Sequence, residues 1–485
     1  MIGLIQNEEL YQYDIRSMLQ AFFDHEKIVE DTKDTRFQLK VEYQAEMTKV
    51  ILMEEGRIKD SRCLKGDYTK KEEFKNPLKR LLYEILSDYT KKCLPWGTMT
   101  GIRPTKVAYE LLAEKVAEEG ILSYYQNEYL TEEQKAKICL EVAKKEQALL
   151  NKVQYEDGYS LYIGIPFCPS TCLYCSFTSY PIGIYRDKVD AYLDALEREI
   201  RFVARNYHHK HLNTIYIGGG TPTSLSAEQL RRLVECINKE FDLSHLLEFT
   251  VEAGRPDSIT KEKLLALKEG NAGRISINPQ TMNDATLKLI GRNHTSAMVE
   301  ETFYLARSLG FDNINMDMIT GLPAEGIREV EHTISAITNL KPDSITVHSL
   351  AIKRAANLSV KRKEFDRMIK GSTNEMLKAV DRSARMLGLE PYYLYRQKNI
   401  PGNLENVGYA TPLKECLYNI LIMEEKQDII AVGAGTSSKF VFPKENRIER
   451  VENVKNVDHY MERIDEMINR KQAFLSDKEE NAWKR

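Results

Sequence analysis

Three cysteines stand close together in the segment Cys168-Pro-Ser-Thr-Cys172-Leu-Tyr-Cys175, directly after an apolar run. Three thiolates at this spacing suit three corners of a cubane iron–sulfur cluster. Zinc usually takes four protein ligands, and no nearby Cys or His completes such a set. The pattern therefore favours a cluster with one open iron, which can hold a small molecule by its amino and carboxylate groups. A zinc loop with a remote ligand, or chance clustering, stays the alternative.

The other residues with metal-binding side chains are less informative. The remaining cysteines occur singly, and we expect each to be a small buried hydrophobic side chain. They are Cys63, Cys93, Cys139, Cys236 and Cys416. The histidines His208, His209 and His211 precede a predicted strand without an acidic or cysteine partner at matching spacing. They indicate a solvated loop rather than a metal site.

The elements that must position the cysteine segment alternate regularly from Ser160 to about residue 352. Six short β-rich runs are separated by amphipathic helical stretches. The runs are SLYIGIP, NTIYIG, LEFTVEA, GRISINP, NINMDMI and SITVHSL. Strands joined by helices pair in parallel through right-handed crossovers. We therefore predict an α/β fold, a six-stranded parallel (β/α)6 partial TIM barrel with its function at the carboxyl ends of the strands. A doubly wound open sheet is the structural alternative.

The flanking segments have a different character. Residues 36–44 and 48–56 alternate like two strands around a turn, and helical spacing follows from about residue 70. Near the end of the chain, the apolar runs YNILIME and DIIAVGAG are predicted as strands. The predicted organisation is an N-terminal α+β domain over 1–155, the barrel over 156–352, and a C-terminal α+β extension over 353–485 that covers the substrate.

The composition excludes several classes of protein. The chain has 485 residues, of which 42% are hydrophobic, and a formal net charge of −3. These values exclude a disordered or disulfide-scaffold protein, and the balanced charge argues against nucleic acid as the main partner. No apolar run approaches ~18 residues, and the first residues lack a basic segment followed by an apolar one. We therefore expect no membrane span and a cytoplasmic location.

Six motifs carry a resemblance to a known family. They are YIGIPFCPSTCLYC (162–175), GGGTPT (218–223), VEAGRPDSI (251–259), RISINPQTMN (274–283), GRNHT (291–295) and INMDMITGLP (314–323). The cysteine triplet after the first barrel strand resembles the radical S-adenosylmethionine (radical SAM) superfamily, and the wider set resembles its oxygen-independent coproporphyrinogen III oxidase family. WGTMTGIRPTK (96–106) and YYLYRQKNIPGNLENVGYA (392–410) resemble the longer coproporphyrinogen dehydrogenase subgroup, which has an extra N-terminal domain.

The resemblance implies the cofactors and the residues that hold them. It implies a [4Fe–4S] cluster on Cys168, Cys172 and Cys175, with S-adenosylmethionine on the open iron. The positions that match the family's contacts to S-adenosylmethionine are Tyr162, Gly218, Gly219, Thr221, Glu252, Gln280, Arg292 and Asp317. A tetracarboxylate substrate also needs cations, for which the two subgroup segments supply Arg103, Arg396 and Lys398.

The resemblance further implies a reaction and its partners. The family converts coproporphyrinogen III to protoporphyrinogen IX in heme biosynthesis, removing two propionate carboxylates as carbon dioxide and leaving vinyl groups. A tetrapyrrole substrate and a low-potential electron donor, such as flavodoxin or ferredoxin, are the expected partners. Within this reading, Tyr162, Arg103 and Arg396 are the candidate catalytic residues.

Two positions depart from the oxidase pattern. Phe177 stands where the oxidases have a fourth cysteine, and Gly164 stands where they have a histidine. Heme-carrier relatives share the phenylalanine. Two alternatives therefore stay open: a heme-binding carrier without decarboxylase activity, and a radical SAM enzyme acting on another tetrapyrrole. The segment GAGTSS (433–438) resembles the family's C-terminal glycine segment, with a flexible loop as its alternative.

Overall fold

The computed structural model describes residues 1–23, 26–30, 35–177, 179–351, 368, 370–397 and 400–483. The chain divides into two compact units. The first unit comprises residues 1–145, 349–352 and 394–406, and the second comprises 146–348, 353–393 and 407–485. The domain boundaries predicted at residues 155 and 352 stay predictions.

The first unit contains a five-stranded sheet in the order β2-β1-β3-β4-β5. Its strands are β1 (Ile2–Gln6), β2 (Ile28–Val29), β3 (Phe37–Gln44), β4 (Met47–Glu54) and β5 (Arg57–Lys65). Its helices are α1 (Gln12–Phe22), α2 (Lys71–Thr90), α3 (Thr105–Ala113), α4 (Glu118–Tyr129) and α5 (Glu133–Leu150), which continues into the second unit. The predicted hairpin forms, with Phe37 paired to Glu54. Apolar side chains of β3 and β4 pack against α1 and α2 to form the core.

The second unit is built on an 11-stranded sheet in the order β14-β15-β13-β12-β11-β10-β9-β6-β16-β17-β18. The six predicted strands are β6 (Gly158–Ile165), β9 (His211–Gly219), β10 (Glu248–Gly254), β11 (Arg274–Ile277), β12 (Ile314–Thr320) and β13 (Ser344–Ser349). The others are β14 (Glu390–Arg396), β15 (Glu405–Ala410), β16 (Asp428–Val432), β17 (Ser437–Phe442) and β18 (Arg447–Glu452). Two short strands, β7 (Phe167–Cys168) and β8 (Tyr180–Pro181), pair separately.

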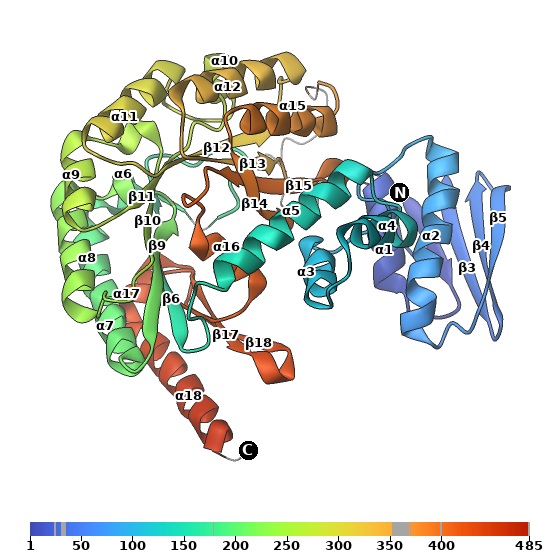
Figure 1. The fold of residues 1–485 in the computed structure, drawn as a ribbon, viewed down its shortest axis with the longest axis horizontal. Helices are drawn as coiled ribbons and strands as arrows, with labels where there is room; N and C mark the ends of the chain where they lie inside the picture. Colours follow the sequence, from blue (N-terminus) through green and yellow to red (C-terminus); the bar gives the residue numbers. More distant parts are fainter. Residues whose placement is uncertain are drawn as a thin grey trace. The chain divides into compact units, whose positions relative to one another are not determined.

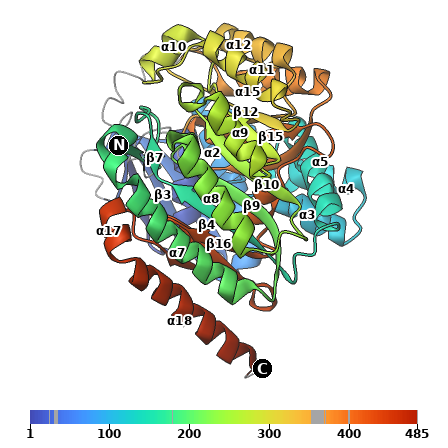
Figure 2. The same ribbon diagram turned by 90° about the vertical axis from the view of Figure 1, so that its left-hand side faces the viewer.

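Helices between these strands cover the outer face of the sheet (Figure 1). They are α7 (Val189–Tyr207), α8 (Ala227–Glu240), α9 (Lys261–Glu269), α10 (Asp284–Leu289), α11 (Ser296–Ser308) and α12 (Ile327–Leu340). Figure 2 shows α7, α8 and α9 side by side over this face. After β13 follow α15 (Thr373–Met386), α16 (Leu417–Glu424), α17 (Val457–Glu462) and α18 (Ile464–Trp483), and the short α6 (Ile182–Tyr185) precedes α7.

The α/β fold is confirmed, but the sheet is larger and more mixed than the sequence predicts. The six predicted strands are neighbours in chain order, and β6, β9, β10, β11 and β12 pair in parallel. The sheet then continues at both edges, with β16 parallel to β6 and β15 antiparallel to β13. These additions cover strand edges that would otherwise be open. No helix in the described part of the chain is long and apolar enough to cross a membrane.

One of the two strand predictions near the end of the chain is wrong. DIIAVGAG forms β16, as predicted, whereas YNILIME lies in helix α16. An apolar run of this length does not distinguish a buried helix from a buried strand. Glu248 instead decides the outcome by capping the helix, since its carboxylate accepts hydrogen bonds from Leu417 N (2.6 Å) and Tyr418 N (3.4 Å).

Candidate functional site

The cysteine loop, residues 168–175, follows β6 and lies against the turn after β9. Thr221 N donates to Phe167 O (2.7 Å), and Cys168 Sγ lies 3.5 Å from Thr221 Oγ1. Phe167 and Cys168 also form β7, which pairs with β8. The first cysteine is therefore fixed by backbone contacts at the carboxyl end of the sheet, where the barrel prediction places function.

Close packing explains the glycine run after β9. Gly219 has a φ of +111°, and a Cβ there would lie 2.9 Å from Ile165 O. A Cβ at Gly220 would lie 2.9 Å from Cys168 Sγ, and one at Gly218 would lie 3.0 Å from the Glu252 carboxylate. Glycine alone permits these approaches without strain. The run therefore brings the β9 backbone against both the cysteine loop and Glu252.

The three thiols of the loop lie within electrostatic reach of one another. Burial raises the pKa of Cys168 to about 11, the Thr221 hydrogen bond and Arg255 lower it, and the charges of Cys175 and Cys172 raise it. Among the described residues, no three Cys, His, Asp or Glu side chains already surround a metal position. The donor set nevertheless fits an iron–sulfur cluster, because it offers three soft sulfur ligands on one short loop and metal binding displaces thiol protons.

Arg255, at the end of β10, holds the cysteine loop from its other side. The residue is 3% exposed, and its Nη1 donates to Ser170 O (2.9 Å) and Ser170 Oγ (2.8 Å) and lies 3.8 Å from Cys172 Sγ. Its Nε and Nη2 donate to the two carboxylate oxygens of Asp257 at 2.9 and 2.7 Å. Arg255 therefore anchors the loop at Ser170 and lies directly beside Cys172.

Several buried polar atoms near the loop have no partner in the described structure. Arg292 donates from Nη2 to Tyr174 Oη (2.8 Å) and from Nη1 to Asn278 O (3.0 Å), but its Nε is unpartnered. Asn278 Oδ1 and Gln280 Oε1 are also buried and unpartnered. Gln280 N donates to Asp317 O (2.9 Å), so these residues meet just after the carboxyl end of β11, beside β12. Unsatisfied buried groups are costly, and this set fits a polar ligand such as S-adenosylmethionine.

Five side chains of the central strands are half-exposed although their strand neighbours are buried. They are Tyr162, Tyr216, Glu252, Asp317 and His348, one from each of β6, β9, β10, β12 and β13. Tyr162 pairs in register with Tyr216, and Val251 pairs with Ile217. The five therefore share the face of the sheet opposite the covering helices. Tyr162, Glu252 and Asp317 are brought together, as the sequence predicts.

The two carboxylates on this face have opposite pKa shifts. Burial, reinforced by the charge of Asp317, raises the pKa of Glu252 to about 7, although Tyr216 Oη donates to its Oε1 (2.7 Å). Burial also acts to raise the pKa of Asp317, but His348 and hydrogen bonds from Asn315 lower it below its usual value. Asn315 Nδ2 lies 2.6 Å from Asp317 Oδ1, and His348 Nε2 lies 3.9 Å from Oδ2. At neutral pH, Asp317 is ionised, whereas Glu252 is present in both its protonated and its ionised form.

A stack of three tyrosines lines one side of this face. Tyr216 and Tyr418 have ring centroids 4.5 Å apart, and Tyr162 lies about equally far from both, at 6.0 and 6.1 Å. The interplanar angles are 26°, 15° and 24°, so the rings are nearly parallel. Offset stacking of this kind stabilises aromatic clusters. Tyr162 is thus held by its neighbours beside Glu252, whose charge adds to burial in raising its pKa.

Gly164 has a steric reason to lack a side chain. A Cβ at this position would overlap Thr436 Cγ2. Gly433, with a φ of +102°, packs against Gly164 O, and Tyr192 Oη donates to the same carbonyl at 2.6 Å. The space that a histidine would fill in the oxidase pattern is therefore occupied by the turn between β16 and β17.

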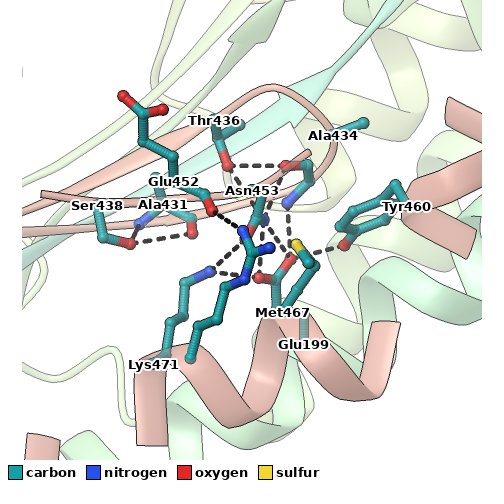
Figure 3. Close-up of polar contacts among 12 residues, drawn as sticks. Glu199, Ala431, Ala434, Thr436, Ser438, Glu452, Asn453, Tyr460, Met467 and Lys471 are labelled. Carbon is teal, nitrogen blue, oxygen red and sulfur yellow. Dashed lines mark hydrogen bonds and ion pairs between the residues drawn. The ribbon is translucent and has the colours of Figure 1, made fainter. Parts of the chain in front are cut away.

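That turn is held by a buried ion pair rather than being a flexible loop. Lys471 Nζ lies 2.6 Å from Glu199 Oε1, with side chains 2% and 0% exposed. Figure 3 shows Asn453 and Tyr460 converging on the same carboxylate, at 2.8 and 2.6 Å. Gly433 N donates to Glu199 Oε2 (2.8 Å). Four donors from the last part of the chain therefore fix the glycine segment to helix α7.

The cations predicted for the substrate lie in the first unit. Arg103 is half-buried just before α3. Arg396 is 2% exposed, donates from Nη1 to Met99 O (2.8 Å), and stacks over Trp96 with the guanidinium 5.3 Å from the ring centroid. Lys398 lies outside the described residues. Part of the Arg396 guanidinium thus has a structural role, and substrate binding by Arg103 and Arg396 stays a prediction.

Several residues of the site, Asn278 among them, were not singled out from the sequence. Arg255 and Tyr216 lie within or next to motifs that were noted for other residues. His348 interrupts the apolar run SITVHSL just as Asp317 interrupts INMDMI, so the same signal was present. Tyr418 comes from a segment whose secondary structure was predicted wrongly, and no local signal marks it.

The isolated cysteines and histidines are placed mostly as expected. Three of the five single cysteines are buried: Cys139, Cys236 and Cys416. Cys63 and Cys93 are exposed, contrary to the prediction, since one lies on the largely exposed strand β5 and the other after α2. His208 and His209 are exposed after α7, which agrees with a solvated loop, whereas His211 is half-buried as the first residue of β9, with its ring centroid 3.9 Å from that of His245.

The sequence of the chain is similar to those of several known proteins. The profile of the radical SAM superfamily matches residues 162–337. The oxygen-independent coproporphyrinogen-III oxidase-like protein HemZ of Bacillus subtilis (strain 168) is 39% identical over 416 residues, which cover 84% of this chain and 83% of that protein. The heme chaperone HemW of the same organism is 43% identical over 194 residues, covering 40% of this chain and 51% of HemW.

A solved structure gives the same fold. Coproporphyrinogen III oxidase (HemN) from Escherichia coli, described as a radical SAM enzyme, superposes with a TM-score of 0.53 and 23% identity. The match covers 66% of this chain and 73% of that protein. At this level of identity the likeness concerns the fold.

Proposed function

We propose a function from the premise that the chain belongs to the radical SAM superfamily and, within it, to the family of oxygen-independent coproporphyrinogen III oxidase-like proteins. The superfamily uses a [4Fe–4S] cluster and S-adenosylmethionine. The proposed reaction is oxidative decarboxylation of coproporphyrinogen III to protoporphyrinogen IX. In each of two rounds a propionate loses a hydrogen atom, carbon dioxide and one electron, and a vinyl group remains.

The main support for this proposal is how much of the chain aligns with a single relative. The coproporphyrinogen-III oxidase-like relative aligns with 84% of the chain, well beyond the 162–337 segment that the superfamily shares. A superfamily domain alone supports radical chemistry without a substrate class. A match that includes flanking segments supports a common tetrapyrrole substrate as well.

The residues of the site have roles that suit this chemistry. When bound, the cluster and S-adenosylmethionine supply a one-electron reduction and a hydrogen-abstracting radical. The three loop thiols would hold the cluster, with Arg255 offsetting the negative charge beside Cys172. The unpartnered atoms of Asn278, Gln280 and Arg292 would receive the polar groups of the cosubstrate.

The carboxylates and the tyrosine stack complete this arrangement. Ionised Asp317 suits a ribose hydroxyl, and Glu252 suits a cationic amino group, which would draw its raised pKa back down. The stacked Tyr162 would present an apolar ring face beside them and help to exclude water.

A second candidate is a heme carrier of the same family. Phe177 stands at the position of the oxidases' fourth cysteine and is 70% exposed. The relative named heme chaperone is 43% identical over the segment that it shares with this chain. This candidate predicts tight heme binding without loss of carbon dioxide.

One anaerobic experiment separates the two candidates. Reconstituted, dithionite-reduced protein is incubated with S-adenosylmethionine and coproporphyrinogen III, and products are resolved by chromatography and mass. The proposal predicts a divinyl product formed through a monovinyl intermediate, with Cys168→Ala as the inactive control. Cosubstrate cleavage without carbon dioxide, combined with tight binding of added hemin, would favour the carrier.

A further inference from the structure

The first unit contains two buried cationic side chains, and neither forms an ion pair with a carboxylate among the described residues. Lys79, on α2, is 6% exposed, and Arg396, at the end of β14, is 2% exposed. Lys79 Nζ donates to Thr100 Oγ1 (3.0 Å). Arg396 donates to Met99 O (2.8 Å) and to Asn403 O (3.0 Å), all neutral acceptors. Both cations therefore meet the same short segment, which begins the motif noted in the sequence as WGTMTGIRPTK.

The nearby carboxylates are already engaged by other cations. Asp14 pairs with Lys75 at 3.3 Å. Glu405 pairs with the buried Lys135 and accepts a hydrogen bond from Trp96 Nε1 (2.7 Å). Because Lys75 is 41% exposed, the buried part of the cluster holds three cations, Lys79, Arg396 and Lys135, against the carboxylates of Asp14 and Glu405. Burying uncompensated positive charge is costly, so the cluster lacks at least one negative group.

One nitrogen of the cluster is free to receive such a group. Arg396 Nη2 is buried and has no hydrogen-bond partner in the part of the chain that the structure describes. Lys79 has three donor hydrogens, of which the structure assigns one, to Thr100. Burial lowers the pKa of Lys79 to about 8 and that of Arg396 to about 10, and the charges of Asp14 and Glu405 offset this effect only in part.

The segment that both cations contact reaches the surface of the first unit. Thr100 is half-buried, and the next residues, Gly101 and Ile102, are exposed, with Ile102 55% exposed. Arg396 N donates to Ile102 O (2.8 Å), so the backbone at Arg396 is joined directly to this exposed segment. The proposed ligand would have to approach beside Thr100.

We propose that Lys79 and Arg396 form a binding site for one carboxylate group, held by Lys79 Nζ, Arg396 Nη2 and Thr100 Oγ1. A guanidinium edge and an ammonium group together match the geometry and charge of a carboxylate. The ligand class is a carboxylate-bearing tetrapyrrole, bound through a propionate. This assignment of the ligand rests on the proposed function, whereas the anion site rests on the buried cations alone.

Titration calorimetry of the full-length protein with coproporphyrin III tests the proposal. Lys79→Met keeps the buried methylenes and removes the charge, and we expect it to weaken binding on the order of thirtyfold or more, as loss of a buried charge-assisted contact does. Lys106→Met is the matched control, because this residue carries the same charge and lies in the motif that Lys79 contacts, but is 46% exposed and pairs with Glu110. It should bind like wild type.

Thermal unfolding without ligand guards against a folding artefact. If Lys79 is uncompensated, Lys79→Met unfolds at the wild-type temperature or above it in chloride buffer. Added coproporphyrin III then stabilises the wild type and not the variant. A lower unfolding temperature for Lys79→Met combined with unchanged coproporphyrin affinity would overturn the site. If inorganic phosphate stabilised the wild type as much as coproporphyrin III does at the same ionic strength, the assignment of a carboxylate ligand would be overturned.

The experiment also separates this proposal from the proposed reaction. Divinyl product formed by Lys79→Met with an unchanged KM would refute the site and leave the reaction standing. Lys79-dependent binding of coproporphyrin III without any product would leave the site standing and refute the reaction.

Discussion

Glu252 offers the sharpest test of the electrostatics described above. Its carboxyl is held beside Gly218, Tyr216 and Asp317, and its pKa is raised from 4.5 to about 7. Between these two pH values the unfolded chain ionises while the folded protein keeps the proton. The folded state therefore loses stability as pH rises from about 4.5 to 7, and the loss is constant above pH 7. Asp317 has a lowered pKa, so its contribution changes only at more acidic pH.

The size of this loss follows from the pKa shift. Raising a carboxyl pKa from 4.5 to about 7 costs about 3 kcal/mol once both states are ionised. Because the side chain is half-exposed, we reduce this figure to about 2 kcal/mol. Glu252→Gln removes the cost and keeps both polar contacts, since a glutamine oxygen can accept from Gly219 N and its amide can donate to the Tyr216 hydroxyl. We therefore expect the variant to be more stable than wild type at pH 8 and equally stable at pH 4.5.

Because the chain has two units, stability is measured locally, at the strands that surround Glu252. Hydrogen–deuterium exchange of peptides from β9 and β10 in the cofactor-free protein gives the opening free energy at each pH. S-adenosylmethionine, which is cationic, should then stabilise wild type more than Glu252→Gln when the cluster is present. A variant as stable as wild type or less stable at pH 8, or a pH profile parallel to that of wild type, would refute the reasoning.

Three further outcomes follow from the same contacts. Alanine at any cysteine of the cysteine loop should abolish the cluster, measured as about four iron and four sulfide per reconstituted chain, whereas Cys236→Ala should leave it intact. Gly220→Ala should lower iron content, because its Cβ would press on Cys168 Sγ; iron content equal to wild type would show that the loop adjusts freely. Lys471→Met should destabilise the protein by about 3–5 kcal/mol in urea unfolding, because it leaves the Glu199 carboxylate buried and unpaired. Adding Glu199→Gln should recover part of that loss. A double variant whose loss of stability equals the sum of the losses in the two single variants would contradict the pairing.

The sequence predicted the features that depend on local spacing. The cysteine triplet, the glycine run and the six β/α repeats are each encoded within a few dozen residues. Their consequences in space, such as Gly220 against Cys168, follow from the adjacency of β6 and β9. Asp317 was identified because its position matches one of the resembled family's contacts to S-adenosylmethionine, and the structure places its backbone carbonyl 2.9 Å from Gln280 N.

Contacts between residues far apart in the sequence could not be predicted from local patterns. Glu199 and Lys471 are 272 residues apart, and nothing near either one marks it as half of a buried pair. The strand β16 joins the sheet beside β6, across more than 260 residues, and so extends the predicted six strands. Tyr418 joins the tyrosine stack from helix α16, whose first turn is capped by Glu248 of the distant strand β10. Each of these contacts is decided by tertiary packing rather than by local propensity.

The loss of a histidine at Gly164 is best understood through the same distant packing. Thr436 occupies the space of the missing side chain, and the turn that carries Thr436 is fixed through Gly433 to Glu199. Restoring a histidine alone would therefore displace a turn held by a buried ion pair. The substitution is thus one part of a coordinated arrangement of β6, α7 and the β16–β17 turn. Tyr162 lies on β6, whereas the loop thiols, the unpartnered polar atoms and Glu252 lie on other elements, so this departure from the oxidase pattern leaves most of the proposed cluster and cosubstrate residues outside the rearranged region. We therefore expect the departure at Gly164 to affect mainly the substrate that binds near the carboxyl end of β6. The anaerobic experiment with coproporphyrinogen III measures this effect.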